Sequence, residues 1–307
     1  MLGPFLDTVL DTVLDRSVVG GYTRFGLAVR RRLPGWPEGP LDLVGKRVVV
    51  TGATAGIGLA AARELVAHGA AVTVVGRDPR RTASAAAEVG ADAAVCDVSS
   101  LASLQAFTSS WTGPIDVLVN NAGVMPPARE LTPDGVELAF ATNVLGPWVL
   151  TRDLARHLPK GGRVVNVSSG GMYGQRLDAD LQNGEYEPVQ AYARTKRAEV
   201  VLTEMWADRL ADKGIRVHAM HPGWALTPGV ESSLPRFRAV MGPALRSPEE
   251  GADTVVWLCG AVEPGRSTGL FWHDRRPRPT HWFGLRQETA ADRERLWRLC
   301  EELAGAA

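Results

Sequence analysis

The chain has 307 residues, of which 45% are hydrophobic, enough to build a buried core for one large or two small domains. It carries 34 basic and 34 acidic residues, so global charge gives no indication of nucleic acid or an acidic partner. No apolar run approaches the roughly 20 residues that span a bilayer, and no secretory signal is evident, so a cytoplasmic location is expected. The three cysteines, Cys96, Cys259 and Cys300, show neither CxxC nor metal-ligand spacing, which favours free thiols and no metal site.

Residues 1–44 are predicted to form an N-terminal helical arm and a linker. Asp-Thr-Val-Leu occurs twice, at 7–10 and 11–14, and a basic stretch and the Pro/Gly-rich segment 33–40 follow. Apolar residues recur at helical spacing along one face, namely Phe5, Leu6, Val9, Leu10, Val13 and Leu14. This helix is expected to pack on the body or on a second subunit. Contact with a membrane is the alternative, and it is not favoured because three aspartates (Asp7, Asp11 and Asp15) interrupt the stretch.

From residue 45 onward, short Val-rich runs alternate with helix-like segments. The predicted strands are 46–51, 71–75, 93–96, 115–119, 163–167, 215–220 and 268–272. The predicted helices are 57–68, 79–88, 100–111, 133–157, 190–213 and 248–262, with a further helix at 287–304. This order predicts a single α/β domain over 45–275, a Rossmann-type doubly wound parallel sheet of seven strands with helices on both faces. Residues 276–307 are a C-terminal extension, and the Pro-containing segment 228–246 is expected over the carboxyl edge of the sheet.

A glycine-rich turn lies between the first predicted strand and the first predicted helix. Its sequence, Thr51-Gly52-Ala53-Thr54-Ala55-Gly56-Ile57-Gly58, places three glycines where a tight turn and a close approach of a pyrophosphate require them. The helix N-terminus beyond it offers free N–H groups and a partial positive charge. The turn therefore predicts a dinucleotide phosphate site.

The spacing TGxxxGxG resembles that of the short-chain dehydrogenase/reductase superfamily, and Asn120-Asn121-Ala122-Gly123 resembles its NNAG element. Asp97, directly after the third strand, is similar to the superfamily's adenine-contacting acid. The resemblance covers about residues 44–275 and implies a nicotinamide dinucleotide cofactor. The cofactor-binding residues it implies in this half of the chain are Thr51, Gly52, Thr54, Ala55, Gly56, Ile57, Gly58, Asp97, Val98, Asn121, Ala122 and Gly123.

The choice between NADP(H) and NAD(H) depends on the end of the second strand. Both an arginine, Arg77, and an acid, Asp78, follow it, but Asp78 precedes Pro79 and so also suits a helix N-cap. Arg77 is then free to meet a 2′-phosphate, which favours NADP(H). Against this, Ala55 stands where NADP-preferring relatives often carry a basic residue.

Tyr192 and Lys196 are four residues apart at the start of a predicted helix, so their side chains share one face. A free phenol titrates near ~10, and a neighbouring ammonium favours its ionised form. The pair resembles the superfamily's YxxxK element, which implies that Tyr192 is the general acid/base. Ser169 is implied to orient the substrate oxygen, and Asn143 to hold a water that links Lys196 to solvent. Ser168 is expected to be an ordinary strand-end residue.

Further segments resemble a narrower group. Pro222, Gly223 and Thr227 resemble the superfamily's PGxxxT segment, which contacts the nicotinamide, and Tyr192 and Lys196 also count as cofactor contacts. Segments 168–173, 178–192, 221–230 and 271–275 are similar to the member-12 type of the dehydrogenase/reductase SDR family. Six residues suit either an apolar pocket or packing in the core or a lid, and packing is favoured for each. They are Tyr173, Trp224, Leu226, Leu234, Phe237 and Met241.

The sequence thus predicts an NAD(P)(H)-dependent oxidoreductase that interconverts an alcohol and a carbonyl on a hydrophobic small molecule. The alternative is a catalytically silent NADP(H)-binding sensor or scaffold on the same fold. Homodimerisation through helices 133–157 and 190–213 is the family's habit. Arg197 and His221 are expected near the site without a chemical role.

Overall fold

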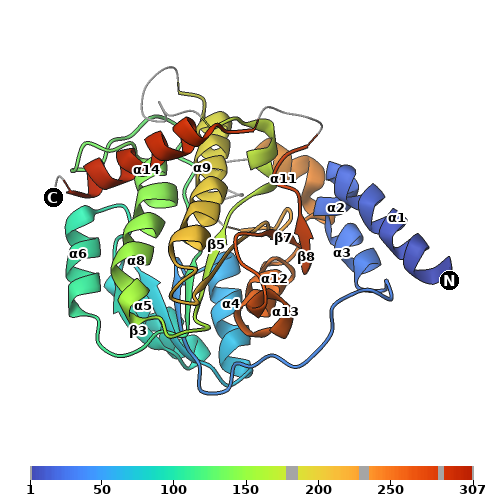
Figure 1. Cartoon of the computed structure of the whole chain (residues 1–307), viewed down its shortest axis with the longest axis horizontal. Helices are drawn as coiled ribbons and strands as arrows, with labels where there is room; N and C mark the ends of the chain where they lie inside the picture. The colour runs from blue at the N-terminus through green and yellow to red at the C-terminus, as the bar shows by residue number, and fades with distance from the viewer. Residues whose placement is uncertain (1, 178–185, 228–234, 283–286, 306–307) are drawn as a thin grey trace.

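The centre of the molecule is one eight-stranded sheet with the order β3-β2-β1-β4-β5-β6-β7-β8 (Figure 1). This computed structural model describes residues 2–177, 186–227, 235–282 and 287–305, without the side chains of residues 2–6. The first seven strands are parallel, as predicted. The strands are β1 Arg47–Thr51, β2 Ala71–Gly76, β3 Asp92–Val95, β4 Val117–Asn120, β5 Arg163–Val167, β6 Arg216–Met220, β7 Phe271–His273 and β8 Arg276–Arg278.

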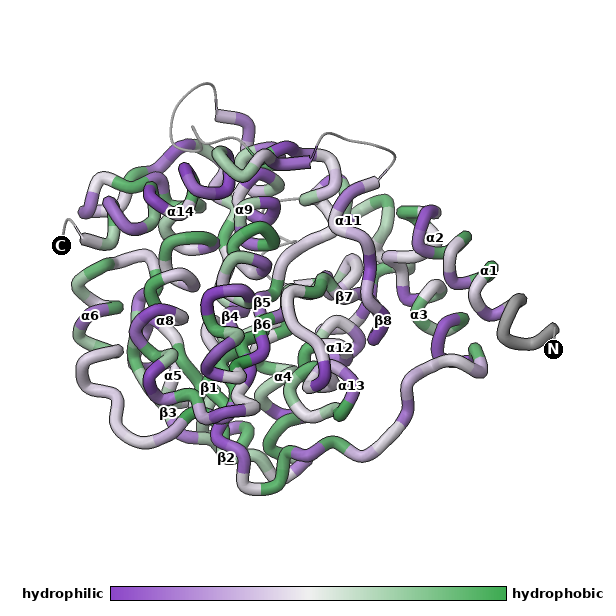
Figure 2. The backbone as a smooth tube through the Cα atoms, viewed as in Figure 1, coloured by the Kyte–Doolittle hydropathy of each residue, from purple (hydrophilic) through white to green (hydrophobic). Residues whose placement is uncertain are grey.

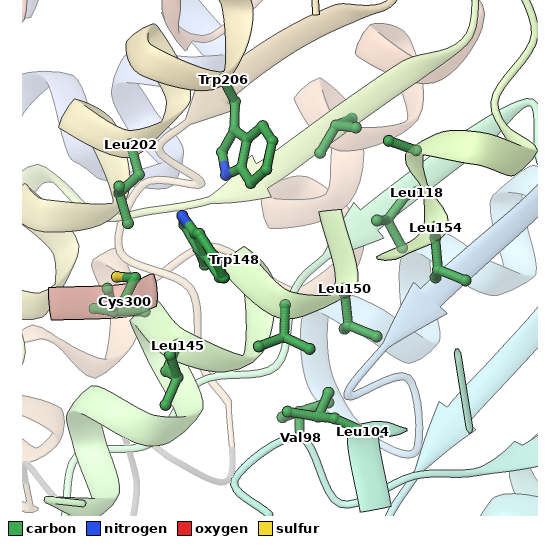
Figure 3. Close-up of a cluster of buried hydrophobic side chains, with 14 of the residues drawn as sticks. Val98, Leu104, Leu118, Leu145, Trp148, Leu150, Leu154, Leu202, Trp206 and Cys300 are labelled. Atoms are coloured by element: carbon green, nitrogen blue, oxygen red, sulfur yellow. The ribbon is translucent and has the colours of Figure 1, made fainter. Parts of the chain in front are cut away.

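Helices cover both faces of the sheet, and each face has its own apolar core. One core lies under α4 (Gly56–Ala67), α5 (Pro79–Val89) and α12 (Pro248–Gly260). The other, part of which Figure 3 shows, lies under α6 (Leu101–Ser110), α8 (Gly146–Leu154), α9 (Pro188–Arg209) and α14 (Ala290–Gly305). Central strands such as β1 are buried from both sides, which is why their valines do not alternate with polar residues.

Two expectations about the edge of the sheet, and a third about one helix, need correction. β8 pairs antiparallel with β7 through a two-residue turn in which Asp274 and Arg275 have φ of 50° and 57°, a left-handed pair typical of a tight hairpin. The predicted strand 268–272 begins only at Phe271. The predicted helix 133–157 begins at Leu138 (α7, Leu138–Phe140), because Glu137 caps it by accepting from the N–H groups of Ala139 and Phe140.

The chain order reverses beside β1, which has β2 on one side and β4 on the other. At such a switch point the loops after the two strands diverge and leave a crevice at the carboxyl edge of the sheet. The glycine turn follows β1 and the NNAG element follows β4, so both predicted cofactor elements lie at this crevice. The excursion expected at 228–246 contains α11 (Pro235–Met241), while 228–234 lie outside the described residues.

The N-terminal arm is the largest departure from expectation. It forms α1 (Leu2–Arg16), α2 (Val18–Tyr22) and α3 (Arg24–Arg30) and lies beside β8, while the C-terminus lies at the opposite end of the molecule (Figure 1). α1 packs on the body, which is one of the two predicted alternatives, but Val9, Leu10 and Val13 of its apolar face are exposed. The face that docks is the acidic one, with all three aspartates buried. Leu14 is half-buried, and the side chains of Phe5 and Leu6 are outside the description.

The acidic face docks because arginines of the body and of α3 meet it. Arg30 donates to Asp11 at 2.9 Å, and Arg278 of β8 donates to both oxygens of Asp11 at 2.7 and 2.8 Å. Arg276 donates to Asp7 at 3.0 Å. Figure 2 shows hydrophobic and hydrophilic residues interspersed along α1. Across the described residues, no helix is long and apolar enough to cross a membrane.

Candidate active site

The glycine turn after β1 has the backbone that a phosphate cradle requires. Gly52 and Gly56 have φ of 64° and 56°, in the left-handed region that side chains rarely adopt. A Cβ on Gly52 would lie 2.8 Å from Cα of Ala122, so only glycine fits between the two loops. Ala55 precedes α4 without a side-chain cap, which leaves the first N–H groups of that helix available to an anion.

The NNAG element is tied directly to this turn. Oγ1 of Thr51 accepts from the N–H groups of Asn121 and Ala122 at 3.0 and 3.1 Å. Nδ2 of Asn121 donates to the carbonyls of Thr51 and Gly52 at 2.9 and 3.2 Å. A Cβ on Gly58 would meet this Nδ2 at 2.4 Å. The two loops therefore form one rigid unit, and the residues present fit a bound dinucleotide.

The ends of β2 and β3 carry the residues predicted to select the cofactor. Oδ1 of Asp78 accepts from the N–H of Arg81 at 2.8 Å and caps α5, so the N-cap interpretation of this acid is confirmed. Arg77 is exposed directly after β2. Asp97 is half-buried after β3, where its Oδ1 accepts from both the N–H and the hydroxyl of Ser99.

Tyr192 and Lys196 lie on consecutive turns of α9, and the Lys196 Nζ atom is 5.8 Å from the centre of the Tyr192 ring. Lys196 is 2% exposed and donates to the carbonyl of Val167 at 2.8 Å, which ties α9 to the end of β5. A Cβ placed on Gly123 would lie 3.5 Å from Nζ, so the NNAG element borders the lysine. The predicted pair therefore meets the cofactor cradle at the carboxyl edge of the sheet.

The two serines after β5 have different environments. Ser168 is buried, and its hydroxyl donates to the carbonyl of Lys196 at 2.9 Å, so it ties the strand end to the helix. Ser169 is half-buried, and its hydroxyl caps the short 3₁₀ helix at Gly170–Gly174 by accepting from the N–H of Gly171 at 3.2 Å.

Asn143 lies in a π-helical turn, Ala141–Leu145, that precedes α8. Its side chain is fully buried. Oδ1 accepts from the N–H of Val124 at 2.8 Å, and Nδ2 donates to the Val124 carbonyl at 3.0 Å and to Oγ1 of Thr195 at 2.9 Å. Asn143 thus joins the NNAG loop to α9. These contacts do not test its water-holding role, which stays a prediction.

The segment after β6 is held by the arm. Gly223 has φ of 78°, and a Cβ there would lie 2.3 Å from Nε of Arg246. Arg246 donates to the Pro222 carbonyl at 3.2 Å, and the N–H of Trp224 donates to the carbonyl of Tyr22 at 2.8 Å. Thr227 is half-buried at the end of the described segment. The arm is therefore part of the wall behind the predicted nicotinamide-contacting segment.

Arg197 and His221, expected near the site without chemistry, are structural. Arg197 donates to both oxygens of Glu288, at 2.5 and 2.7 Å, and to the carbonyl of Thr280 at 2.6 Å. His221 is buried with Tyr22 edge-on at 4.2 Å between ring centres. Burial lowers its pKa well below the usual range, helped by the nearby His273 and Arg246, so the ring is neutral.

Most of the residues considered for an apolar pocket pack against neighbouring side chains instead. Tyr173 stacks on Trp282 at 4.1 Å, and its hydroxyl donates to the carbonyl of Pro279. Trp224 packs edge-on against Phe237 at 5.1 Å. Leu226 and Met241 are half-buried, and Leu234 lies outside the described residues.

One residue beside the predicted site was missed. Glu199 is 3% exposed, and its Oε2 lies 3.0 Å from Nζ of Lys196. The signal was available, because residues i and i+3 of a helix are neighbours and Glu199 follows Lys196 by three.

The fold and site define a class, the doubly wound α/β proteins built around a dinucleotide-type phosphate turn. Within that class the family model described as short chain dehydrogenase matches residues 46–236. The chain belongs to this family and is an oxidoreductase, as the sequence motifs predicted.

Its relatives include the predicted branch. The chain is 42% identical over 280 residues to Dehydrogenase/reductase SDR family member 12 of Bos taurus, a match covering 86% of this chain and 88% of the relative. It is 33% identical over 281 residues to Retinol dehydrogenase 12 of Mus musculus, with the same coverage of 86% and 88%. A short chain dehydrogenase from Burkholderia cenocepacia J2315 in complex with NADP has a TM-score of 0.61 and 27% identity, covering 75% of this chain and 96% of that one.

Proposed function

We propose that this oxidoreductase interconverts an alcohol and a carbonyl on a hydrophobic small molecule, with NADP(H) as cofactor and Tyr192 as general acid/base. The observation that carries the proposal is the meeting of three elements at one edge of the sheet. The buried ammonium of Lys196 lies 5.8 Å from the Tyr192 ring and borders Gly123, next to the glycine cradle. A phenol, an ammonium and a phosphate cradle at one crevice suit hydride transfer coupled to proton transfer.

Each side chain then has a defined task. Tyr192 removes the hydroxyl proton in oxidation and returns it to the developing alkoxide in reduction. Lys196, fixed by Val167, favours the ionised phenol through its charge. Ser169 orients the substrate oxygen, and Asn143 holds a water near Lys196. When bound, the nicotinamide supplies the hydride acceptor or donor.

The preference for NADP(H) rests on Arg77 and Asp78. The carboxylate of Asp78 is committed to capping α5, so it is poorly placed to grip a ribose 2′-hydroxyl. Arg77 is exposed beside the cradle and suits a 2′-phosphate. That one structural neighbour holds NADP, and that one relative is named a retinol dehydrogenase, supports the cofactor and a hydrophobic substrate respectively.

A panel assay tests the proposal. Purified full-length protein is mixed with NADPH or NADP⁺ and with carbonyls and alcohols of increasing apolar size, and nicotinamide absorbance is followed. We expect turnover that falls by at least 10²-fold in Tyr192→Phe while cofactor affinity stays within a few fold. If the protein binds cofactor but shows no more turnover than Tyr192→Phe does, the enzymatic proposal is wrong. That result would instead support a silent NADP(H) sensor.

We also propose a cytoplasmic location in which the arm contacts anionic membrane surfaces. The aspartates that argued against membrane contact are buried in ion pairs, and the arm instead exposes Val13, Val19 and Phe25, each at least 60%. Among described residues 7–32, all exposed charged side chains are arginines, namely Arg16, Arg24, Arg31 and Arg32. An apolar face flanked by cations suits anionic lipid headgroups.

Flotation with vesicles of phosphatidylcholine, with and without phosphatidylserine, tests this contact. We expect the full chain to float with the anionic vesicles only, and the double variant Val13→Asp, Phe25→Asp to stay in solution. Failure of the unmodified chain to bind would refute the membrane proposal. If the same variant converts a dimer to a monomer in size-exclusion chromatography, a second copy of the chain covers this face instead.

A further inference from the structure

Glu199 and Lys196 form an isolated buried ion pair beside the proposed acid/base. Their side chains are each 3% exposed, and the Nζ–Oε2 distance is 3.0 Å. Burying two charges is costly unless each is well paired, so the pair constrains both side chains strongly. No step of the proposed reaction uses the carboxylate, which makes its presence next to Lys196 unexplained by that reaction.

The contacts of the ammonium show what the carboxylate does to its geometry. An ammonium has three N–H donors. One of them points to the Val167 carbonyl at 2.8 Å and another to Glu199. The remaining donor is left for the side on which Gly123 lies, where an added Cβ would be 3.5 Å from Nζ. Glu199 therefore helps to fix the direction in which Lys196 presents its last donor to the site.

The charge of the pair matters as much as its geometry. With Glu199 ionised, Lys196 and Glu199 together carry no net charge. With Glu199 neutral, the full positive charge of Lys196 acts on the phenol one helical turn away, and a positive neighbour favours phenolate. We propose, on the basis of the proposed function, that Glu199 is a positioning residue whose charge state sets how strongly Lys196 promotes ionisation of Tyr192.

The surroundings place this change of charge in the neutral range. Burial raises the pKa of Glu199 to about 7, and the charge and hydrogen bond of Lys196 limit the rise. The other elements packed against Glu199 contribute no charge in the described part of the chain. The side chains that line a small cavity together with Glu199 are uncharged, namely Val144, Pro147, Trp148, Thr151, Asn166, Leu202 and Trp206, from the π-helical turn, α8, β5 and α9.

A small cavity lies beside Glu199. It has a volume of about 10 Å³ and is lined by Glu199, Trp148 and Trp206. The indole nitrogens of both tryptophans are buried without an acceptor in the described residues, and Figure 3 shows them pointing toward one another. Two indole donors and a carboxylate are partners that suit one water in such a space.

Glu199→Gln tests the inference because it keeps the shape and removes the charge. Without that negative charge, Lys196 favours phenolate at lower pH. We expect the acid limb of the alcohol-oxidation rate to move down by on the order of one pH unit, and Glu199→Asp to return it toward its original position. Glu204→Gln is the matched control, since Glu204 is on the same helix but pairs with Arg293 at 2.5 Å. An unshifted limb in Glu199→Gln, or an equal shift in Glu204→Gln, would overturn the proposal.

Thermal unfolding of the protein without cofactor or substrate supplies a second readout. Because the folded-state pKa of Glu199 is raised, its stabilising effect is present below the unfolded value near ~4.3 and is lost as pH rises through about 7. The Tm of Glu199→Gln should therefore gain on that of the unmodified protein between about pH 4.5 and 7, the window that the two pKa values set. A constant Tm difference over this range would refute the titration of Glu199 even if the enzymatic proposal holds. A growing difference without any turnover would refute the enzymatic proposal alone.

Discussion

The sheet and the N-terminal arm bury opposite kinds of side chain. In the sheet, β1 and β4 place valines and leucines between two helical layers, and Leu118 is fully buried. In the arm, α1 turns Val13 outward at 60% exposure and turns Asp11 inward. The strands are continuous apolar runs, whereas the apolar residues of α1 recur at helical spacing. The difference teaches that periodicity identifies the helix, while the partner surface decides which face of it is buried.

The partner surface of the arm is built from arginines. Arg30 is 1% exposed and donates to Asp11 and, at 2.7 Å, to Asp274 of the body. Arg246 holds the same Asp274 through two bonds, at 2.6 and 2.9 Å, and also donates to the carbonyl of Gly21. Burial opposes the charge of Asp274, but Arg246 and Arg30 hold the pKa of this carboxyl well below its usual range. The arm is thus attached through a desolvated ionic network.

The largest effect is expected from Asp274→Ala, which breaks this network at its centre. Two buried guanidinium groups, of Arg30 and Arg246, would lose their shared counter-ion. Removing one partner of a buried pair costs about 3–5 kcal/mol of unfolding free energy. Chemical denaturation measures it, with Asp42→Ala as control, since Asp42 pairs with Lys46 at the surface and its loss should change little. Equal small changes in both variants would show that the arm does not depend on the network.

Leu118→Ala tests the sheet side of the comparison. Leu118 lies on β4 in the core of Figure 3, and truncating a buried leucine costs about 2–5 kcal/mol, through lost burial and the cavity that forms. The matched variant is Val13→Ala on α1, expected to cost no more than about 0.5 kcal/mol because its side chain is already in solvent. A large loss in Val13→Ala would mean that another surface covers the arm in solution.

The smallest effect is local and depends on pH. Burial opposes ionisation of Asp11, but Arg278, Arg30 and Arg276 lower its pKa to about 2. A lowered pKa means that its stabilising contribution is present above the unfolded value of ~3.9 and is lost as pH falls toward 2. Hydrogen exchange should show the amides of α1 losing protection over this range before those of β4. Simultaneous loss in both elements would contradict a separate ionic attachment.

The sequence motifs predicted the family and the parallel sheet correctly, and the structure brings the predicted site residues to one edge of the sheet, because each motif depends on local spacing. Glycines at fixed intervals make one turn, and Tyr192 and Lys196 share a helix face whatever surrounds them. The Asp78-Pro79 cap was equally local, and the structure confirms it. The one missed neighbour, Glu199, obeys the same helical spacing, but nothing in the sequence indicates that its side chain is buried.

By itself, then, the sequence determined the order of elements and the composition of the crevice at the carboxyl edge of β1 and β4. Only the tertiary structure decided that α1 docks by its aspartates, that β8 turns back beside β7, and that Glu199 pairs with Lys196 out of solvent. The physical reason is the range of the interactions. Backbone turns and helix faces are set within a few residues, whereas Asp11 meets Arg278 across 267 positions of chain.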